Sequence, residues 1–330
     1  MLIGCQPTTD HPVEENTPTK MEWSIAIHGG AGHFDEESYS KAEEELYLET
    51  LSKALHQGQA ILESGGSSID AVAEAIMVME NFPLFNAGKG AVFTSEGINE
   101  MDASIMNGAD LNCGAVTGIQ NVKNPILAAK EVMENSRHVF FSGNGATEFA
   151  RAQGLEMVDS LYFYTDKAWS RYLKVKQREE ESAQSDTGYK PPKFGTVGCV
   201  ALDQNGNLAA GTSTGGMTYK RNGRIGDSPV VAAGTYADNN SCAVSCTGHG
   251  EYFIRAAVAH DIAARMEYKE ISADSAAKEV VMDKLVDMGG EGGIIVVDKF
   301  GNASFVFNST GMFRGATNST GDFEVAMYAK

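Results

Sequence analysis

The residues best suited to chemistry in this chain lie just past its middle, where residues 195–198 read GTVG at the start of a strand-like run. Inside a chain, the hydroxyl of Thr196 is a poor nucleophile that has no base of its own. If the chain is cut before Thr196, the residue gains an α-amine within reach of its Oγ, and such an amine can act as the general base. Gly195 would supply a flexible, unhindered carbonyl for that cut.

A serine mechanism competes with this threonine. Residues 211–215, GTSTG, match the nucleophile motif of α/β-hydrolases, and Asp227 and His249 follow in the order of a Ser–Asp–His triad. The motif requires a strand, a sharp turn and a helix. Here it ends a predicted hairpin strand and is followed by the polar run 217–223, which is not helical. The local pattern therefore favours the threonine.

Composition limits the partners. The chain has 330 residues, of which 42% are apolar, so it can bury a substantial core, and its formal net charge is −18. An acidic surface argues against nucleic acid or an anionic membrane as the main partner. His28 and His249 have no second ligand at metal-binding spacing, so we expect no cofactor for catalysis.

The elements that must position these residues alternate between helical and strand patterns, without regular βαβ units. This favours an α+β fold with helices packed on antiparallel sheets. The predicted helices cover residues 37–64, a helix capped by Ser68, 125–136, 145–153, 250–266 and 272–288. The predicted strands cover 24–27, 196–203, 208–214, 292–298, 303–308 and 322–328, with a glycine-rich turn at 28–32 and a loop at 165–194.

The first 20 residues differ from the rest. Residues 2–5, LIGC, resemble the lipobox of bacterial lipoproteins, in which the cysteine is acylated, and residues 6–20 have the polar composition of a flexible tether. Only four residues precede Cys5, so either a leader upstream has been lost or the match is due to chance. We expect a tether at 1–20 with a lipid anchor at Cys5, and hence a periplasmic or membrane-anchored protein. The alternative is a cytoplasmic protein.

Six blocks in a fixed order carry a family resemblance. They are residues 27–32 (IHGGAG), 85–90 (FNAGKG), 195–203 (GTVGCVALD), 212–217 (TSTGGM), 223–229 (GRIGDSP) and 245–251 (SCTGHGE). Together they resemble the plant-type L-asparaginase / isoaspartyl peptidase family of N-terminal nucleophile hydrolases, over residues 22–329. The resemblance implies a four-layer αββα sandwich. It also implies self-cleavage between Gly195 and Thr196 into an α subunit, 21–195, and a β subunit, 196–330, which assemble as (αβ)₂.

The resemblance also implies the catalytic residues. Thr196 would be the nucleophile, and Thr214, next to it across the hairpin, would tune its hydroxyl or amine. Thr247 and Gly248 would form the oxyanion hole, with one hydroxyl and one backbone N–H. Asn86 would either polarise a carbonyl or serve as a turn residue with left-handed geometry.

Substrate recognition would rest on a loop. A β-aspartyl substrate presents an α-carboxylate, which Arg224 can clamp through two parallel bonds, and an α-ammonium, which Asp227 can hold. The alternative for these two residues is a surface ion pair of little consequence. Gly250 would let the substrate approach the backbone closely.

The family also binds a sodium ion through main-chain carbonyls of one loop. The corresponding positions here are Met79, Glu80, Phe82, Phe85, Ala87 and Lys89. Their side chains do not demand an ion, so this site rests on the resemblance alone.

We therefore expect an autoproteolytically activated threonine hydrolase that cleaves β-aspartyl dipeptides and L-asparagine. Two alternatives remain: a glycosylasparaginase-like amidase of the same fold, and a binding protein that keeps the fold without processing.

Overall fold

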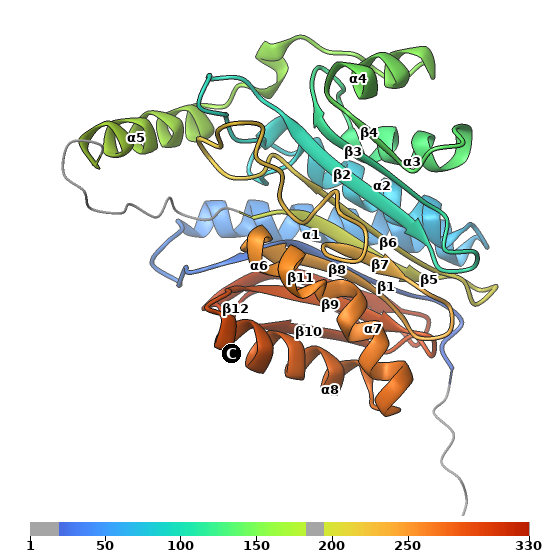
Figure 1. Cartoon of the computed structure of the whole chain (residues 1–330). Helices are drawn as coiled ribbons and strands as arrows, with labels where there is room; N and C mark the ends of the chain where they lie inside the picture. The colour runs from blue at the N-terminus through green and yellow to red at the C-terminus, as the bar shows by residue number, and fades with distance from the viewer. Residues whose placement is uncertain (1–19, 183–194, 330) are drawn as a thin grey trace, which may run out of the picture.

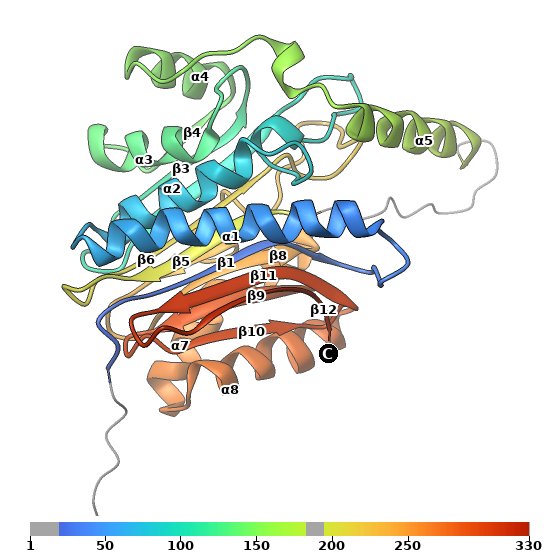
Figure 2. The same cartoon turned by 180° about the vertical axis from the view of Figure 1, so that it is seen from behind.

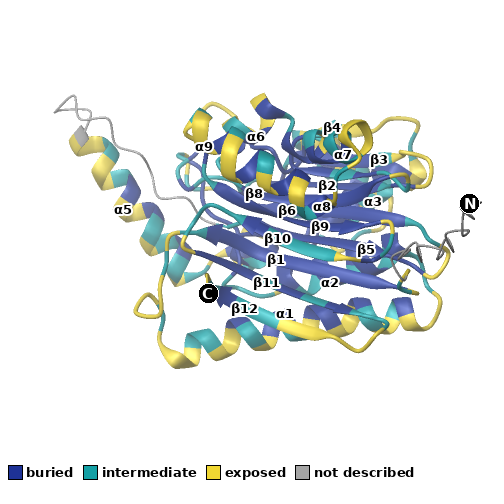
Figure 3. Ribbon diagram, turned by 90° about the horizontal axis from the view of Figure 1, so that it is seen from below, coloured by how far each residue is buried: buried dark blue, intermediate teal, exposed yellow. Residues whose placement is uncertain are grey.

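The computed structural model describes residues 20–182 and 195–329, and these form four layers (Figure 1). A sheet of eight strands packs face to face on a sheet of four, and helices cover the outer face of each. Figure 3 shows that the strands of both sheets are buried along most of their length. The predicted α+β sandwich is confirmed. Cys5 and the predicted tether up to residue 19 lie outside the described residues.

The larger sheet carries both halves of the chain. Its order is β12-β11-β1-β5-β6-β2-β3-β4, antiparallel except for the β3–β4 pair. The strands are β1 (Ser24–Gly32), β2 (Met101–Asn107), β3 (Cys113–Ile119), β4 (Phe140–Ser142), β5 (Val197–Leu202), β6 (Leu208–Thr214), β11 (Gly311–Asn318) and β12 (Phe323–Tyr328). The hairpin β5–β6, predicted from its sequence, lies at the centre of this sheet.

The smaller sheet has the order β10-β9-β8-β7 and is antiparallel throughout. Its strands are β7 (Thr235–Ala237), β8 (Cys242–Gly248), β9 (Gly292–Asp298) and β10 (Ala303–Phe307). Apolar side chains of the two inner faces, such as Val200 and Ile295, form one core between the sheets. That interior fixes the distance between β5 and β8. Thr196 immediately precedes β5, and Thr247 is the second-last residue of β8.

The helices form the two outer layers. The larger sheet is covered by α1 (Lys41–Glu63), α2 (Ser68–Glu80), α3 (Pro125–Asn135) and α4 (Gly143–Ala152), as Figure 2 shows for α1 and α2. The smaller sheet is covered by α7 (Val258–Lys269), α8 (Ala273–Lys278) and the π-helical turn Glu279–Lys284. The remaining helical segments are α5 (Asp166–Ser182), α6 (Gly250–Ala256), α9 (Leu285–Met288) and the 3₁₀ turns Gly88–Gly90 and Ser160–Phe163. None of the helices in the described ranges is long and apolar enough to span a membrane.

Three predicted elements differ from the structure. Residues 165–182 of the predicted loop form mostly helix, because α5 buries Ala168, Tyr172 and Val175 on one side. The predicted helix at 250–266 is two helices, α6 and α7, which meet where Ala257 has a left-handed backbone. The cap of α2 is Ser67, whose hydroxyl accepts a hydrogen bond from the Asp70 N–H, and not the predicted Ser68.

The predicted glycine-rich turn at 28–32 is also wrong. These residues continue β1 as an extended strand, with a shift in register between His28 and Gly30. A Cβ on Gly29 would collide with the ring of Phe85, and a Cβ on Gly30 would collide with the backbone of Gly195. The glycines are therefore required by close packing at the start of the second half of the chain, and not by a reversal of direction.

Candidate active site

Thr196 immediately precedes β5, between two neighbouring strands of the larger sheet. On one side β5 pairs with β1, and on the other side Val197 lies opposite Ser213 of β6. This register brings Thr214 beside Thr196, and the Thr196 hydroxyl donates a hydrogen bond of 3.2 Å to the Thr214 hydroxyl. Thr214 also accepts a bond of 3.0 Å from the Gly216 N–H, which fixes its position.

A pocket opens directly beside Thr196 and collects most of the residues predicted from the sequence. It lies where the ends of β5, β6 and β8 meet the loop after β6. Its lining residues are Thr196, Thr214, Gly216, Met217, Arg224, Gly226, Asp227, Ser228, Gly248 and His249. The structure thus places a threonine nucleophile candidate and both charged recognition candidates around one space.

Asp227 is the unusual charge in this pocket. It is 4% exposed, and its Oδ2 has no hydrogen-bond partner among the described residues. Burial raises the pKa of this carboxyl to about 7, although the nearby positive charge of Arg224 acts in the opposite direction. A buried carboxylate without a partner is costly. The site therefore suits a cationic ligand group with N–H donors.

Arg224 is not paired with Asp227, so the alternative of an ion pair between them is wrong. Its Nε and Nη2 donate to the two carboxylate oxygens of Glu251, at 2.9 and 3.0 Å. This bond pair occupies one edge of the guanidinium. Apart from Glu251, no side chain of the described residues bonds to the edge formed by Nη1 and Nη2, which suits a second carboxylate. The sequence assigns no role to Glu251 beyond its place in the first turn of α6, next to the predicted Gly250.

Gly250 lies against protein and not against the pocket. A Cβ at this position would be 2.9 Å from the backbone N of Asp227, from the Cα of Gly226 and from Nη2 of Arg224. The close approach that we expected for the substrate is thus made by the loop that carries Arg224 and Asp227. Glycine here allows that loop to pack on the start of α6.

The two oxyanion-hole candidates differ in exposure to the pocket. Gly248 ends β8 and lines the pocket. Thr247 is buried, and its hydroxyl oxygen accepts a hydrogen bond of 3.3 Å from the Ala31 N–H. Because this contact uses the oxygen of Thr247 as acceptor, it leaves the hydroxyl proton for donation.

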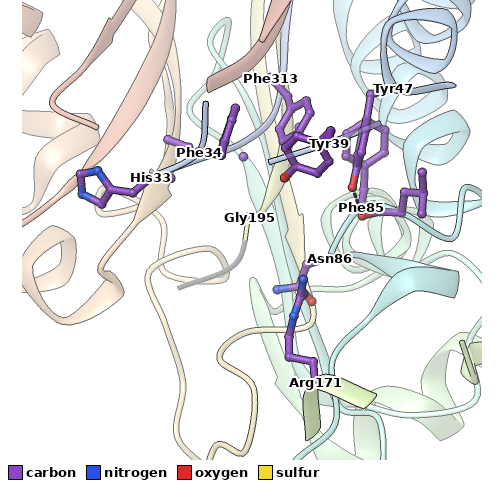
Figure 4. Close-up of a pocket in the computed structure, with 14 residues that line it drawn as sticks. His33, Phe34, Tyr39, Tyr47, Phe85, Asn86, Arg171, Gly195 and Phe313 are labelled. Carbon is purple, nitrogen blue, oxygen red and sulfur yellow. Dashed lines mark hydrogen bonds between the residues drawn. The ribbon is translucent and has the colours of Figure 1, made fainter. Parts of the chain in front are cut away.

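Asn86 holds Gly216, which lines the pocket, in place. Its side-chain nitrogen donates to the Gly216 carbonyl at 2.8 Å, and its side-chain oxygen accepts from the Val92 N–H at 3.0 Å. Its backbone does not have a positive φ, so the expected alternative of a left-handed turn residue is wrong. Asn86 also borders a second pocket, on the Gly195 side, where Figure 4 shows Arg171 beside it and the rings of Tyr39 and Tyr47 along the wall.

The loop predicted to bind sodium folds around a glycine turn. Gly88 has a φ of +51°, and a Cβ there would collide with the carbonyl oxygen of Glu80. A Cβ on Gly90 would collide with the carbonyl oxygen of Phe85. Two carbonyl oxygens of the loop thus lie against its two glycines, and main-chain carbonyl oxygens are ligands that suit a hard cation. Among the described residues, no group of three or more His, Cys, Asp or Glu side chains is placed to hold a metal ion.

The serine alternative does not assemble. Ser213 lies within β6, fully buried, and donates to a carboxylate oxygen of Glu80 at 2.6 Å. His249 stacks on Tyr252, and Asp227 makes no bond to it. Ser213 therefore has neither the exposed turn nor the histidine that a triad requires.

A four-layer αββα sandwich with a threonine at the head of a central strand defines the N-terminal nucleophile hydrolase class of fold. Comparison with known proteins agrees, because the model of the asparaginase family matches residues 21–327. The chain belongs to this family, whose members are hydrolases.

Named relatives cover nearly the whole chain. An isoaspartyl peptidase of Escherichia coli is 49% identical over 90% of this chain and 95% of its own length. A probable isoaspartyl peptidase/L-asparaginase of Arabidopsis thaliana is 43% identical over 93% of this chain and 99% of its own. An isoaspartyl peptidase/L-asparaginase of Danio rerio is 39% identical over 87% and 90%, respectively. The resemblance found in the six sequence blocks is thereby confirmed.

Proposed function

We propose that this protein is an autoproteolytically activated threonine hydrolase that cleaves β-aspartyl dipeptides and hydrolyses L-asparagine to L-aspartate and ammonia. The observation that carries the proposal is the pocket beside Thr196, where the buried carboxylate of Asp227 accompanies the guanidinium of Arg224. The Oδ2 of Asp227 has no hydrogen-bond partner among the described residues. An aspartyl group has one ammonium and one carboxylate on its α-carbon, which match these two charges. The names of the relatives point to the same substrates.

Activation would begin with the bond before Thr196. The Thr196 Oγ attacks the Gly195 carbonyl carbon, the C–N bond breaks, and the acyl group moves from nitrogen to oxygen. Water then hydrolyses the ester, which leaves a carboxylate on Gly195 and a free amine and hydroxyl on Thr196. The packing of Gly30 on Gly195 holds the scissile carbonyl against β1.

Catalysis would use the same oxygen again. The new α-amine takes the Oγ proton, and Oγ attacks the side-chain carbonyl of the substrate. Thr247 and the Gly248 N–H stabilise the oxyanion, and Thr214 holds the Thr196 hydroxyl. The amine passes the proton to the leaving nitrogen, and water then releases aspartate from the acyl-enzyme.

Binding of the aspartyl group would use the charges described above. Asp227 accepts hydrogen bonds from the substrate ammonium, and the Nη1–Nη2 edge of Arg224 holds its α-carboxylate while Glu251 holds the other edge. Both contacts are made to the acyl part of the substrate. The leaving side stays open to ammonia or an amino acid, which fits activity on both substrate types.

Three further properties belong to the proposal. The processed subunits assemble as (αβ)₂, the carbonyls of the 79–89 loop hold a structural sodium ion, and a lipid on Cys5 anchors the protein to a membrane. A sodium ion in that loop would stiffen the main chain on either side of Asn86, which holds Gly216 in place.

The test compares the purified protein with its Thr196→Ala variant by intact mass and by release of leucine from β-Asp-Leu. The proposal expects two fragments that split before Thr196 and turnover in the parent, and a single inactive chain in the variant. A parent chain that stays whole and inactive would identify a binding protein instead. Faster cleavage of a glycosylated asparagine than of β-Asp-Leu would identify the glycosylasparaginase-like alternative.

A further inference from the structure

A buried histidine contacts the main chain of Thr196, and the catalytic steps above do not use it. His28 lies in β1, fully buried, opposite Gly198 of β5. Its Nδ1 is 3.0 Å from the carbonyl oxygen of Thr196, and its Nε2 is 2.9 Å from the hydroxyl of Ser245. Both ring nitrogens are therefore engaged, one by the nucleophile residue and one by the smaller sheet.

The partners of the ring determine where its proton lies. A carbonyl oxygen can only accept, so Nδ1 must carry the proton and donate it to Thr196. Burial lowers the pKa of His28 to about 3, so the ring is neutral and Nε2 has a lone pair. Ser245 then donates its hydroxyl proton to Nε2. The ring acts as a rigid spacer with one fixed tautomer.

Gly198 makes room for this contact. A Cβ at position 198 would collide with both the Ser245 hydroxyl and Nε2 of His28. The second glycine of the GTVG block is therefore explained by the histidine and serine that fill its side-chain space. The GTVG block thus contains the candidate nucleophile, Thr196, and the glycine, Gly198, that leaves space for the contact between His28 and Ser245.

Close hydroxyl contacts continue from Ser245 through the space between the sheets. Ser245 contacts the hydroxyl of Thr212 at 2.7 Å, and the last member, Ser104, donates to the carbonyl of Ser228 at 2.6 Å. The four residues that supply these hydroxyls are all buried. Its members in order are His28, Ser245, Thr212, Thr235 and Ser104, from strands β1, β8, β6, β7 and β2.

The two ends of this hydroxyl chain contact two residues that line the pocket. One end holds the carbonyl of Thr196, and the other holds Ser228, which follows Asp227 and itself lines the pocket. Because Ser245 gives its single proton to His28, it must accept from Thr212. At the other end Ser104 gives its proton to Ser228, so the one Thr235 proton serves either Thr212 or Ser104, and the other of these two contacts is close packing without a proton. Each end is thus a directed contact to one functional segment.

We propose that His28 is a positioning residue for Thr196, and that the hydroxyl chain from Ser245 to Ser104 ties the nucleophile to the Asp227 loop. This inference rests on the proposed function, since it assumes that Thr196 is the nucleophile. Loss of the His28 contact lets Thr196 shift, and a misplacement of about 1 Å can lower a rate about 10²-fold. Loss of the Ser104 contact loosens the recognition loop.

The test uses matched variants of the full chain. His28→Leu removes both ring contacts, whereas His28→Asn keeps a side-chain N–H at about the place of Nδ1. Self-cleavage is followed by mass and turnover by β-Asp-Leu hydrolysis. We expect His28→Leu to lower kcat and the rate of self-cleavage about 10²-fold with KM changed less than about threefold. His28→Asn should recover at least tenfold of that loss.

Ser104→Ala tests the other end and should raise KM several-fold with kcat nearly unchanged. Val280→Ala is the control for lost stability, because Val280 is buried in the layer outside the smaller sheet. It should leave kcat unchanged even if it lowers the melting temperature. If His28→Leu does not fold, Ser245→Ala, which keeps the ring but removes its proton donor, should still lower kcat about tenfold.

The inference is overturned if the folded His28→Leu or Ser245→Ala variant keeps the kcat of the parent, or if His28→Asn is no better than His28→Leu. It is also overturned if Ser104→Ala lowers kcat in place of raising KM. Thr196→Ala separates this result from the proposed function. An active Thr196→Ala variant refutes the nucleophile itself, whereas an inactive one beside a fully active His28→Leu variant refutes only the positioning role.

Discussion

Asp227→Asn should make the folded protein more stable above pH 7 and at the same time weaken substrate binding. The carboxyl of Asp227 is buried, and its Oδ2 has no partner among the described residues. An amide of the same shape removes the cost of burying that charge. It also removes the negative charge that the substrate ammonium requires. A stabilising change that damages function is characteristic of a site built for a ligand.

The size of the effect follows from the shift in pKa. Burial raises the pKa of Asp227 from 3.8 to about 7, or about 3 units. Each unit corresponds to 1.36 kcal/mol, so the charged carboxylate lowers the free energy of unfolding by about 4 kcal/mol above pH 7. The unfolded chain loses this proton near pH 4 and the folded chain near pH 7. Stability from this group is therefore present at low pH and is lost as pH rises between these values.

The assay measures urea unfolding at pH 5 and pH 8 in a Thr196→Ala background, so that every chain is uncut. The difference in free energy of unfolding between Asp227→Asn and its parent should grow by about 2–3 kcal/mol from pH 5 to pH 8. Asp110→Asn, at an exposed position, is the control and should show no such pH-dependent gain. In processed protein, Asp227→Asn should raise KM at least tenfold, since a hydrogen bond to a charged group contributes about 1.5–3 kcal/mol.

Two results would refute this reasoning. If Asp227→Asn destabilises the protein at pH 8, the carboxylate is held by interactions that an amide cannot replace. If its KM for β-Asp-Leu equals that of the parent, the ammonium is bound elsewhere. In the parent, kcat/KM should also fall about tenfold for each pH unit below about pH 7, because protonated Asp227 cannot pair with the ammonium.

Two further changes test neighbouring contacts by steady-state kinetics. Thr214→Val removes the acceptor 3.2 Å from the Thr196 hydroxyl and should lower kcat about tenfold, whereas Thr214→Ser should stay near the parent; equal kcat values for both variants would contradict this role. Glu251→Ala releases the Nε–Nη2 edge of Arg224 and should raise KM about tenfold with little change in kcat, because the guanidinium loses the partner that aims it; an unchanged KM would show that Arg224 needs no such support.

The parts of the fold that could be predicted are those in which a local pattern decides the structure. The β5–β6 hairpin follows from its alternating strands and the turn at Asn205 and Gly206, and β9 lies where it was predicted. By contrast, α5 is so rich in charge that its composition is typical of a loop, although Ala168, Tyr172 and Val175 are buried at helical spacing. Strands β2 and β3 were missed because they are buried on both faces, so they lack the alternation that marks a half-buried strand.

The candidate site could be predicted only where chemistry is visible in one short segment. Thr196, Arg224 and Asp227 lie in short blocks that carry the family resemblance, and the structure places them around one pocket. Glu251 and His28 could not be predicted, because their roles depend on partners 27 and 168 residues away. Contacts of this kind are created by sheet register and helix packing, and the residues around Glu251 or His28 do not reveal which distant partner each one contacts.

The glycines of residues 28–32 show how such distant contacts still leave a trace. Their sequence is typical of a turn, yet they form part of a strand in which Gly29 lies against Phe85 and Gly30 against Gly195. At Gly198 likewise, His28 and Ser245 fill the space that a side chain would occupy. At each of these glycines, atoms of another segment fill the space that a side chain would occupy. A glycine inside a buried strand next to a candidate nucleophile therefore indicates that another segment packs closely against the main chain there. Around Thr196 that crowding comes from β1, which supplies both the neighbour of Gly195 and the ring that holds the Thr196 carbonyl.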